Sequence, residues 1–117
     1  MTREELLEAI DKSEAEYYTF NRWRYHGEDG DCHCLMGQVA LDLTGANEET
    51  ATQVAKALKM ERSLVNIIAR RYDMAVEDWL GPVRSEEVSC IPAEQAKMFG
   101  KRVVNEVFTH FERSPHE

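Results

Sequence analysis

Residues 31–45 have the sequence DCHCLMGQVALDLTG, which holds two of the three cysteines and the pattern of an apolar helix. Leu35 and Val39 are four residues apart, the spacing that places side chains on one face of an α-helix. Gly45 stands where helices often end in a left-handed residue. The stretch therefore predicts a helix that begins near Cys32 and ends at Gly45.

Capping signals predict further helices on both sides of this stretch. Thr2 and Glu5 have the spacing of a capping box, in which each side chain accepts a hydrogen bond from the other residue's backbone N–H. Asn47 suits the cap of a third helix, and a break near Met60 leads to a fourth. Pro92 suits the first position of a last helix, whose wide apolar stripe predicts a central place in the fold.

Residues 73–91 look irregular, because glycine, proline and two serines interrupt any helical pattern there. The aromatic and β-branched residues between Tyr17 and Tyr25 are the one cluster that also suits a strand. The sequence predicts an all-α fold, a single compact bundle of four to five helices with a long irregular connection before the last helix. We expect one helical domain over residues 1–113 and a frayed tail at 114–117.

The chain has 117 residues, a length typical of one domain, with 43% hydrophobic and 31% charged residues. It shows no signal-peptide pattern at the start and no apolar run near the ~20 residues that span a bilayer. Its three cysteines are an odd number, which favours reduced thiols over a disulfide framework. We therefore expect a cytoplasmic protein without a membrane partner.

The net charge of −8 disfavours general binding to nucleic acid, whose phosphates repel an acidic surface. Residues 1–31 and 73–94 hold most of the acidic excess, whereas residues 56–72 carry five basic side chains and one acidic one. The acidic stretches predict a binding or regulatory protein that contacts a basic partner, such as a nucleic-acid-handling protein. Acidic side chains that only maintain solubility are the alternative explanation.

The cysteine cluster raises two chemical alternatives. His26, Cys32 and Cys34 are zinc-ligand types, but the second ligand pair of a structural zinc site is missing. We expect Cys34 to be buried and structural, with zinc binding through these three residues kept as an alternative. A cysteine nucleophile is disfavoured because the neighbouring acids raise its pKa and no orienting third residue is defined. The sequence thus predicts no catalysis and no cofactor.

Residues 53–67 resemble the helix-turn-helix pattern of bacterial repressors. Ala55 falls where the first helix must be small, Leu58 lies beside the turn, and Val65 takes the buried position of the recognition helix. Lys59 departs from the pattern, which most often has glycine there. The resemblance implies a second alternative, a DNA-binding regulator that uses residues 53–70. The residues facing DNA would be Arg62, Ser63, Asn66 and Arg70. We expect instead that the helix pair is a structural corner of the bundle. Its arginines would then pair with nearby acids such as Asp73, Glu77 and Asp78.

Landmarks along most of the chain follow a recognisable order: Trp23, a polar turn with glycine, the helix start Cys34–Gly37, and helices that end at Arg71–Asp73. This order resembles a group of small, largely uncharacterised helical proteins of phages and their bacterial hosts. The resemblance implies an all-helical fold and an origin in a phage or another mobile element. It implies a structural role for Cys34 and Gly37 and supplies no active site.

Overall fold

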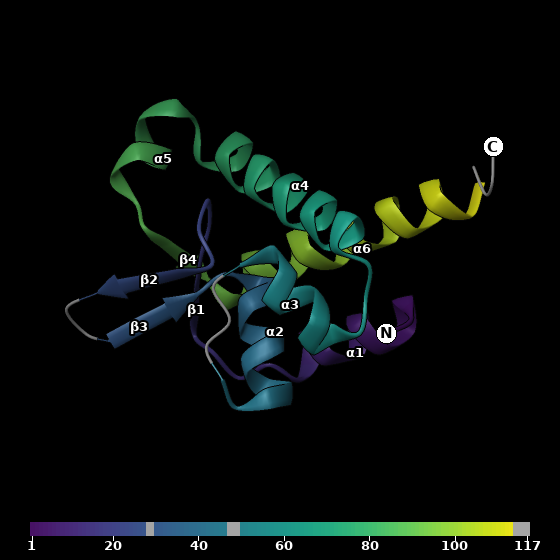
Figure 1. Cartoon of the computed structure of the whole chain (residues 1–117). Coiled ribbons are helices and arrows are strands. Elements are labelled where there is room, and N and C mark those ends of the chain that lie inside the picture. The colour runs from purple at the N-terminus through teal and green to yellow at the C-terminus, as the bar shows by residue number, and fades with distance from the viewer. Residues whose placement is uncertain (28–29, 47–49, 114–117) are drawn as a thin grey trace.

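The computed structural model of the chain describes residues 1–27, 30–46 and 50–113, with only the backbone at residues 26, 27, 30 and 111–113. The helices are α1 (Arg3–Lys12), α2 (Leu35–Thr44), α3 (Ala51–Leu58), α4 (Arg62–Leu80), α5 (Pro82–Glu87) and α6 (Ala93–Arg113), as Figure 1 shows. The strands are β1 (Tyr17–Thr19), β2 (Arg24–Gly27), β3 (Gly30–His33) and β4 (Cys90–Pro92). Within the described residues, no helix combines the length and the apolar character needed to cross a membrane.

The strands show that the predicted all-α fold is wrong. The described chain is mixed α/β, about 70% helical, with two small antiparallel sheets. β1 pairs with β4, which places Tyr18 opposite Ile91, and β2 and β3 form a hairpin with Tyr25 opposite Cys32. β1 lies in the aromatic cluster that suited a strand, but its partner is far along the chain. Such short strands, stabilised by a distant partner, leave no periodic pattern in the sequence.

The expected irregular connection at residues 73–91 is also wrong. α4 continues to Leu80 because Tyr72, Val76 and Leu80, four residues apart, extend its buried stripe. Gly81 then ends the helix with a φ of +85°, and α5 and β4 follow. α5 brings the number of helices in the described chain to six, one more than the upper end of the prediction.

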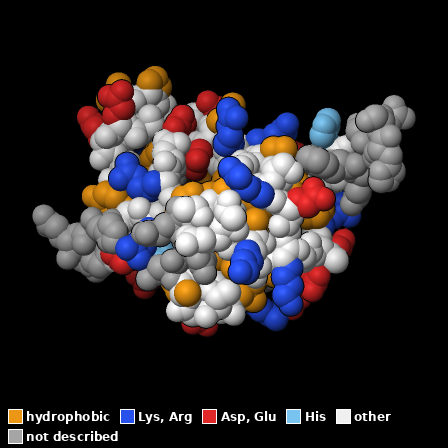
Figure 2. Space-filling view, in the orientation of Figure 1, with side chains coloured by type: hydrophobic (Ala, Val, Ile, Leu, Met, Phe, Trp, Pro, Cys, Tyr) orange, Lys and Arg blue, Asp and Glu red, His pale blue; other side chains and the backbone are white. Residues whose placement is uncertain are grey.

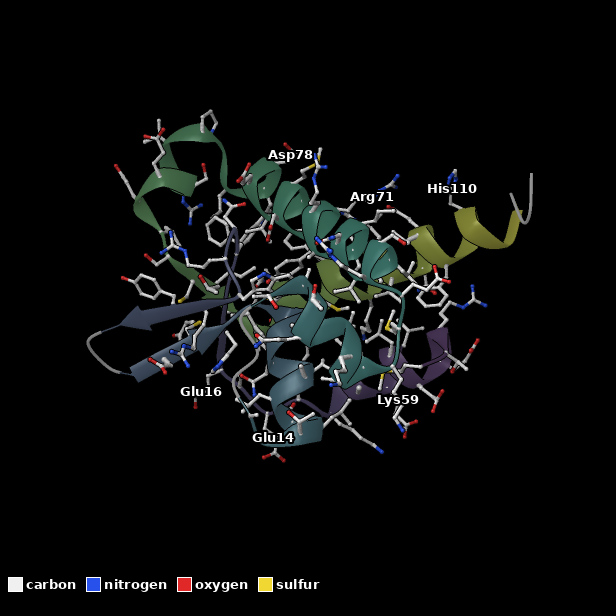
Figure 3. The ribbon with its side chains drawn as sticks, viewed as in Figure 1. Glu14, Glu16, Lys59, Arg71, Asp78 and His110 are labelled. Atoms are coloured by element: carbon white, nitrogen blue, oxygen red, sulfur yellow. The ribbon has the colours of Figure 1, made fainter. Side chains whose placement is uncertain are left out.

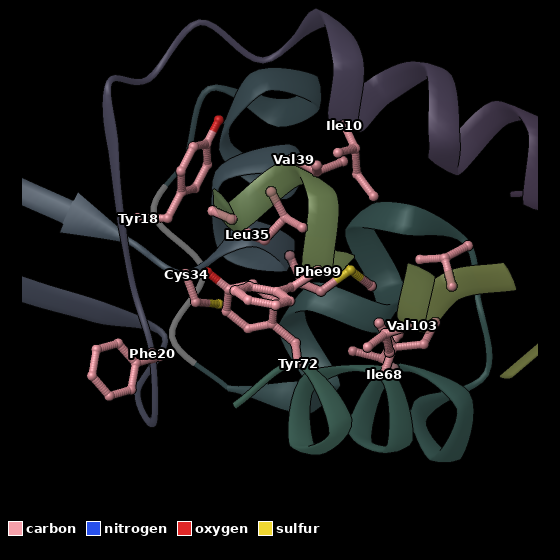
Figure 4. Close-up of a cluster of buried hydrophobic side chains, with 14 of the residues drawn as sticks. Ile10, Tyr18, Phe20, Cys34, Leu35, Val39, Ile68, Tyr72, Phe99 and Val103 are labelled. Atoms are coloured by element: carbon pink, nitrogen blue, oxygen red, sulfur yellow. The ribbon is translucent and has the colours of Figure 1, made fainter. Parts of the chain in front are cut away.

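The last helix lies in the middle of the fold, as its wide apolar stripe predicts. α6 packs against α1 and α4 and also contacts β1 and β4. In the core shown in Figure 4, Phe99 and Val103 of α6 meet Leu35 from α2 and Ile68 from α4. Trp79 lies beside this core, 44% exposed, with its ring centroid 5.7 Å from that of Phe99.

Several helix ends follow the local signals in the sequence. The capping box is confirmed, because the Thr2 hydroxyl accepts from the Glu5 N–H at 3.1 Å and the Glu5 carboxylate accepts from the Thr2 N–H at 2.9 Å. Gly45 ends α2 in the left-handed conformation, with φ +74°. The expected cap Asn47 lies outside the described residues, and Thr50 caps α3 instead. The expected tail at 114–117 lies outside the described residues too.

Candidate nucleic-acid interface

α3 and α4 are joined by a turn of three residues, from Lys59 to Glu61. Lys59 adopts the left-handed conformation, with φ +54° and ψ +48°, and the Met60 N–H donates to the Ala55 carbonyl oxygen at 3.0 Å. These features close the end of α3 as a glycine would. The lysine that departs from the helix-turn-helix pattern therefore keeps the turn, at a strain of about 1 kcal/mol.

Buried side chains fix the angle between the two helices. Leu58 at the end of α3 and Val65 in the first half of α4 are 1% and 0% exposed, and Ala55 is 5% exposed. The small Ala55 lets the helices approach, and each large apolar side chain that is fully buried contributes about 2 kcal/mol. α4 therefore has a fixed orientation relative to α3, which a helix must have to enter the DNA major groove.

The four residues assigned to DNA contact lie on the first half of α4. Arg62, Ser63 and Arg70 are exposed, and Asn66 is partly exposed. Arg62, Asn66 and Arg70 follow one another at four-residue intervals, so they lie along one side of the helix. The structure thus brings the assigned residues together on the surface next to the turn.

We use the name basic face for the five exposed basic side chains of α3, the turn and α4: Lys56, Lys59, Arg62, Arg70 and Arg71. In Figure 2, Lys and Arg side chains are spread over the side of α3 and α4 that faces the viewer, and red side chains lie mostly around its edge. In the part of the chain that the structure describes, none of these five side chains forms an ion pair. Their charge is therefore available to an anionic partner.

The expected pairing of the α4 arginines with Asp73, Glu77 and Asp78 is wrong, since none of these side chains forms an ion pair among the described residues. The Asp73 carboxylate accepts from the Asn21 N–H at 2.9 Å, and the Glu77 carboxylate accepts from the Asn21 side-chain amide. Two of the three acids thus accept hydrogen bonds from Asn21, which follows β1. Asp78 forms no ion pair among the described residues.

Cys34 has the buried, structural place that the sequence predicts. It follows β3, so α2 begins at Leu35 and not near Cys32 as expected. Its sulfur accepts a hydrogen bond from the Gly37 N–H at 3.3 Å and caps the helix, and Figure 4 shows the side chain beside the ring of Tyr72. Burial raises the pKa of the Cys34 thiol to about 12. The thiol stays protonated at neutral pH, which disfavours nucleophilic attack.

The zinc alternative gains no support from the other cysteines. Cys32 is half-buried on β3 and interacts with the thiol of Cys90 on β4. Burial, followed by this contact with Cys90, raises the pKa of the Cys32 thiol far above its ordinary value. The side chain of His26 lies outside the described residues. Among the residues whose side chains are described, no three His, Cys, Asp or Glu gather as a metal site requires.

A second charged surface lies on α1 and α2, and we call it the acidic groove. It has a volume of about 510 Å³ and is lined by four carboxylates: Glu5, Glu8, Glu14 and Asp42. Apolar side chains, among them the 51% exposed Leu43, complete the lining. Lys12 also lines the groove and pairs with Glu8 at 2.8 Å, so part of the negative charge is neutralised locally.

All five bases of the basic face stand out in the sequence, but the helix-turn-helix pattern leaves out three of them: Lys56, Lys59 and Arg71. Their charge was visible, but the helix-turn-helix pattern assigns positions on the recognition helix and says little of flanking cations. It also missed α6 as a neighbour of α4, since Arg102 and its surroundings reach α4 through tertiary packing alone.

Comparisons of the chain with protein-family models, with curated proteins and with solved structures found no match. The resemblances to repressors and to phage proteins therefore stay predictions from the sequence. What the protein binds has to be inferred from its own residues and their geometry.

Proposed function

We propose that the protein is a DNA-binding regulator that inserts the first half of α4 into the major groove. The observation that carries this proposal is the three-residue turn, which places Arg62, Ser63 and Asn66 beside basic side chains without ion pairs. Arginine can donate two hydrogen bonds to the edge of guanine, and asparagine can bind the edge of adenine. Lys56 and Lys59 would contact the phosphates that fix the register on the duplex.

The acidic net charge sets the conditions under which this binding occurs. Repulsion from the rest of the surface acts over about 10 Å at 0.1 M salt, whereas phosphate contacts act at short range. A single copy presents one recognition helix, which predicts weak binding. We therefore expect two copies on DNA half-sites about 34 Å apart, one helical turn of the duplex.

A gel-shift assay against mixed genomic fragments, with the mass in solution measured in parallel by sedimentation, tests the proposal. We expect a salt-sensitive complex that favours a subset of fragments and contains two copies of the chain. The matched control is Arg84→Gln on α5, an exposed arginine outside the basic face, which should bind as the wild type does. Absence of any complex at low salt and roughly 100 µM protein, the weak end of non-specific DNA binding, would contradict the proposal.

The acidic groove favours a second candidate function, the one that the composition first suggests: binding of a basic segment of another protein. Four carboxylates around an apolar floor suit a lysine- or arginine-rich helix with one apolar side. A pull-down from a bacterial lysate, repeated with the Asp42→Lys variant and at low and high salt, tests this candidate. A partner that the wild type retains at low salt and the variant loses would support it. Equal recovery with both proteins would count against it.

A further inference from the structure

A groove of about 580 Å³ runs between α4 and α6, and two of its lining residues, Arg70 and Arg71, also belong to the basic face. Its floor is apolar and comes from both helices: Ile67, Met74, Val103 and Val107. Met74 is 58% exposed, an unusual position for a large apolar side chain on a helix that has another helix beside it. The volume falls within the ~300–1,000 Å³ range typical of small-molecule sites.

Arginines from both helices line the rim of this groove: Arg70 and Arg71 from α4, and Arg102 from α6. Figure 3 shows Arg71 and Asp78 along α4 and His110 near the end of α6, the side on which the groove lies. In the described part of the chain, Arg70 and Arg71 have no carboxylate partner. Arg102 lies over the ring of Phe99 at 5.3 Å and has a long, 3.9 Å contact with Glu106.

The two acids that line the groove offset only two of the three arginine charges on its rim. Glu106 is held by Arg102, four residues before it on the same helix. Asp78 lies eight residues beyond Arg70, about two turns further along α4. An anionic group near Arg71 would therefore find guanidinium N–H groups that are available as hydrogen-bond donors. An apolar body attached to it would cover Met74 and the valines of α6.

We propose that the groove binds a small amphipathic anion, an organic acid with an aromatic or aliphatic body. Arg71 and Arg102 hold the acid group through charge-assisted hydrogen bonds, which planar guanidinium groups make well with carboxylates and sulfonates. Met74 adapts to the shape of the body, as flexible thioether side chains do at binding surfaces. Arg70 and Arg71 belong to both this groove and the basic face, so a bound anion would compete with DNA for two cations of the basic face.

Titration with anilinonaphthalene sulfonate, an aromatic sulfonate that fluoresces in apolar surroundings, tests this site in the absence of DNA. We expect saturable binding of one probe per chain. The variants Arg71→Gln and Arg102→Gln should each weaken it about ten-fold, as the loss of a hydrogen bond to a charged group predicts. Arg84→Gln should bind as the wild type does. The uncharged analogue phenylnaphthylamine should bind at least ten times more weakly.

Three results would overturn the proposal: no saturable binding, wild-type affinity in both rim variants, or equal affinity for the uncharged analogue. Both substituted arginines line an open groove, and circular dichroism of each variant confirms that the fold is kept. The readout needs no DNA. A failed gel-shift assay with intact probe binding would reject the proposed function and leave this site standing.

Discussion

The basic face and the acidic groove differ in how their charges are neutralised. In the groove, Glu8 pairs with Lys12, and on the same helix Asp11 pairs with Lys101 of α6, both at 2.8 Å. On the basic face no side chain forms an ion pair with a described residue, and the neighbouring acids Asp73 and Glu77 accept hydrogen bonds from Asn21. The comparison teaches that a net charge of −8 does not describe what a given surface attracts.

The largest expected difference between the two regions is the loss of folding stability when a leucine in each is replaced by alanine. Leu58 fastens α3 to α4 and is 1% exposed, whereas Leu43 lines the acidic groove and is 51% exposed. Leu58→Ala should lower the free energy of unfolding by about 2–5 kcal/mol, because it leaves a cavity at the joint. Leu43→Ala should cost about 0.5 kcal/mol or less. Urea denaturation of both variants measures the difference, and equal losses would show that the joint is not a rigid support.

Reversing charges in each region distinguishes the effect of local charge on DNA binding from the effect of net charge. Arg62→Glu with Arg70→Glu makes the chain more acidic by four units, and Glu8→Lys with Asp42→Lys makes it more basic by the same amount. We expect the first pair to weaken DNA binding about 100-fold, since two base or phosphate contacts are lost. The second pair should strengthen it less than about ten-fold, because those residues lie outside the contact surface. Fluorescence anisotropy with a labelled duplex measures both, and opposite changes of equal size would favour net charge.

Asp73 lies on α4 but belongs to neither region. Its titration tests whether its carboxyl group is buried beside Asn21 and not paired with a cation of the basic face. Burial raises the pKa of Asp73 from 3.8 to about 6, with Glu77 adding to the rise and the Asn21 N–H opposing it. The unfolded chain loses this proton near pH 4 and the folded chain near pH 6, so stability should fall as pH rises between these values. Asp73→Asn should remove that fall. Melting temperatures of both proteins across this range provide the check, and parallel curves would contradict the assignment.

The smallest expected effect is the change in folding stability at Lys59, for which Gly45 provides a matched control. Both end a helix in the left-handed conformation, one as lysine and the other as glycine. Lys59→Gly should stabilise the fold by about 1 kcal/mol, and Gly45→Ala should destabilise it by a similar amount. Lys59→Gly should also weaken DNA binding a few-fold, since one cation of the basic face is lost. A variant that loses stability would mean that Lys59 makes a favourable contact which outweighs its strain.

The sequence predicted the features that depend on neighbours a few residues away. The Thr2–Glu5 capping box, the left-handed Gly45 and the buried Cys34 all follow from local chemistry, and all are present. Gly37, for which the phage resemblance implies a structural role, leaves room for the Trp23 segment, because a Cβ there would lie 2.9 Å from the Trp23 carbonyl oxygen. Local patterns also placed the turn between α3 and α4.

What the sequence could not provide depends on residues that meet only in the folded chain. β1 is a strand because β4 pairs with it, and the two segments have most of the chain between them. Glycine, proline and two serines suggested an irregular segment over residues 73–91, although the buried side chains of Val76 and Leu80 extend α4 to Leu80. The sequence near α4 also could not show that the Asp73 and Glu77 carboxylates accept hydrogen bonds from Asn21, which lies far away along the chain.

The central claim is that the basic face, and not the net charge, decides what the protein binds. The salt dependence of binding to a labelled DNA duplex tests it most directly, with wild type, Arg62→Gln, Arg70→Gln and Arg84→Gln compared. If each of the five cations of the basic face neutralises one phosphate charge, the logarithm of the affinity falls against the logarithm of salt with a slope of about −4.5. Arg62→Gln and Arg70→Gln should each bring that slope about one unit closer to zero, and Arg84→Gln should leave it unchanged. A slope that is the same in all four proteins, or no binding at low salt, would contradict the claim.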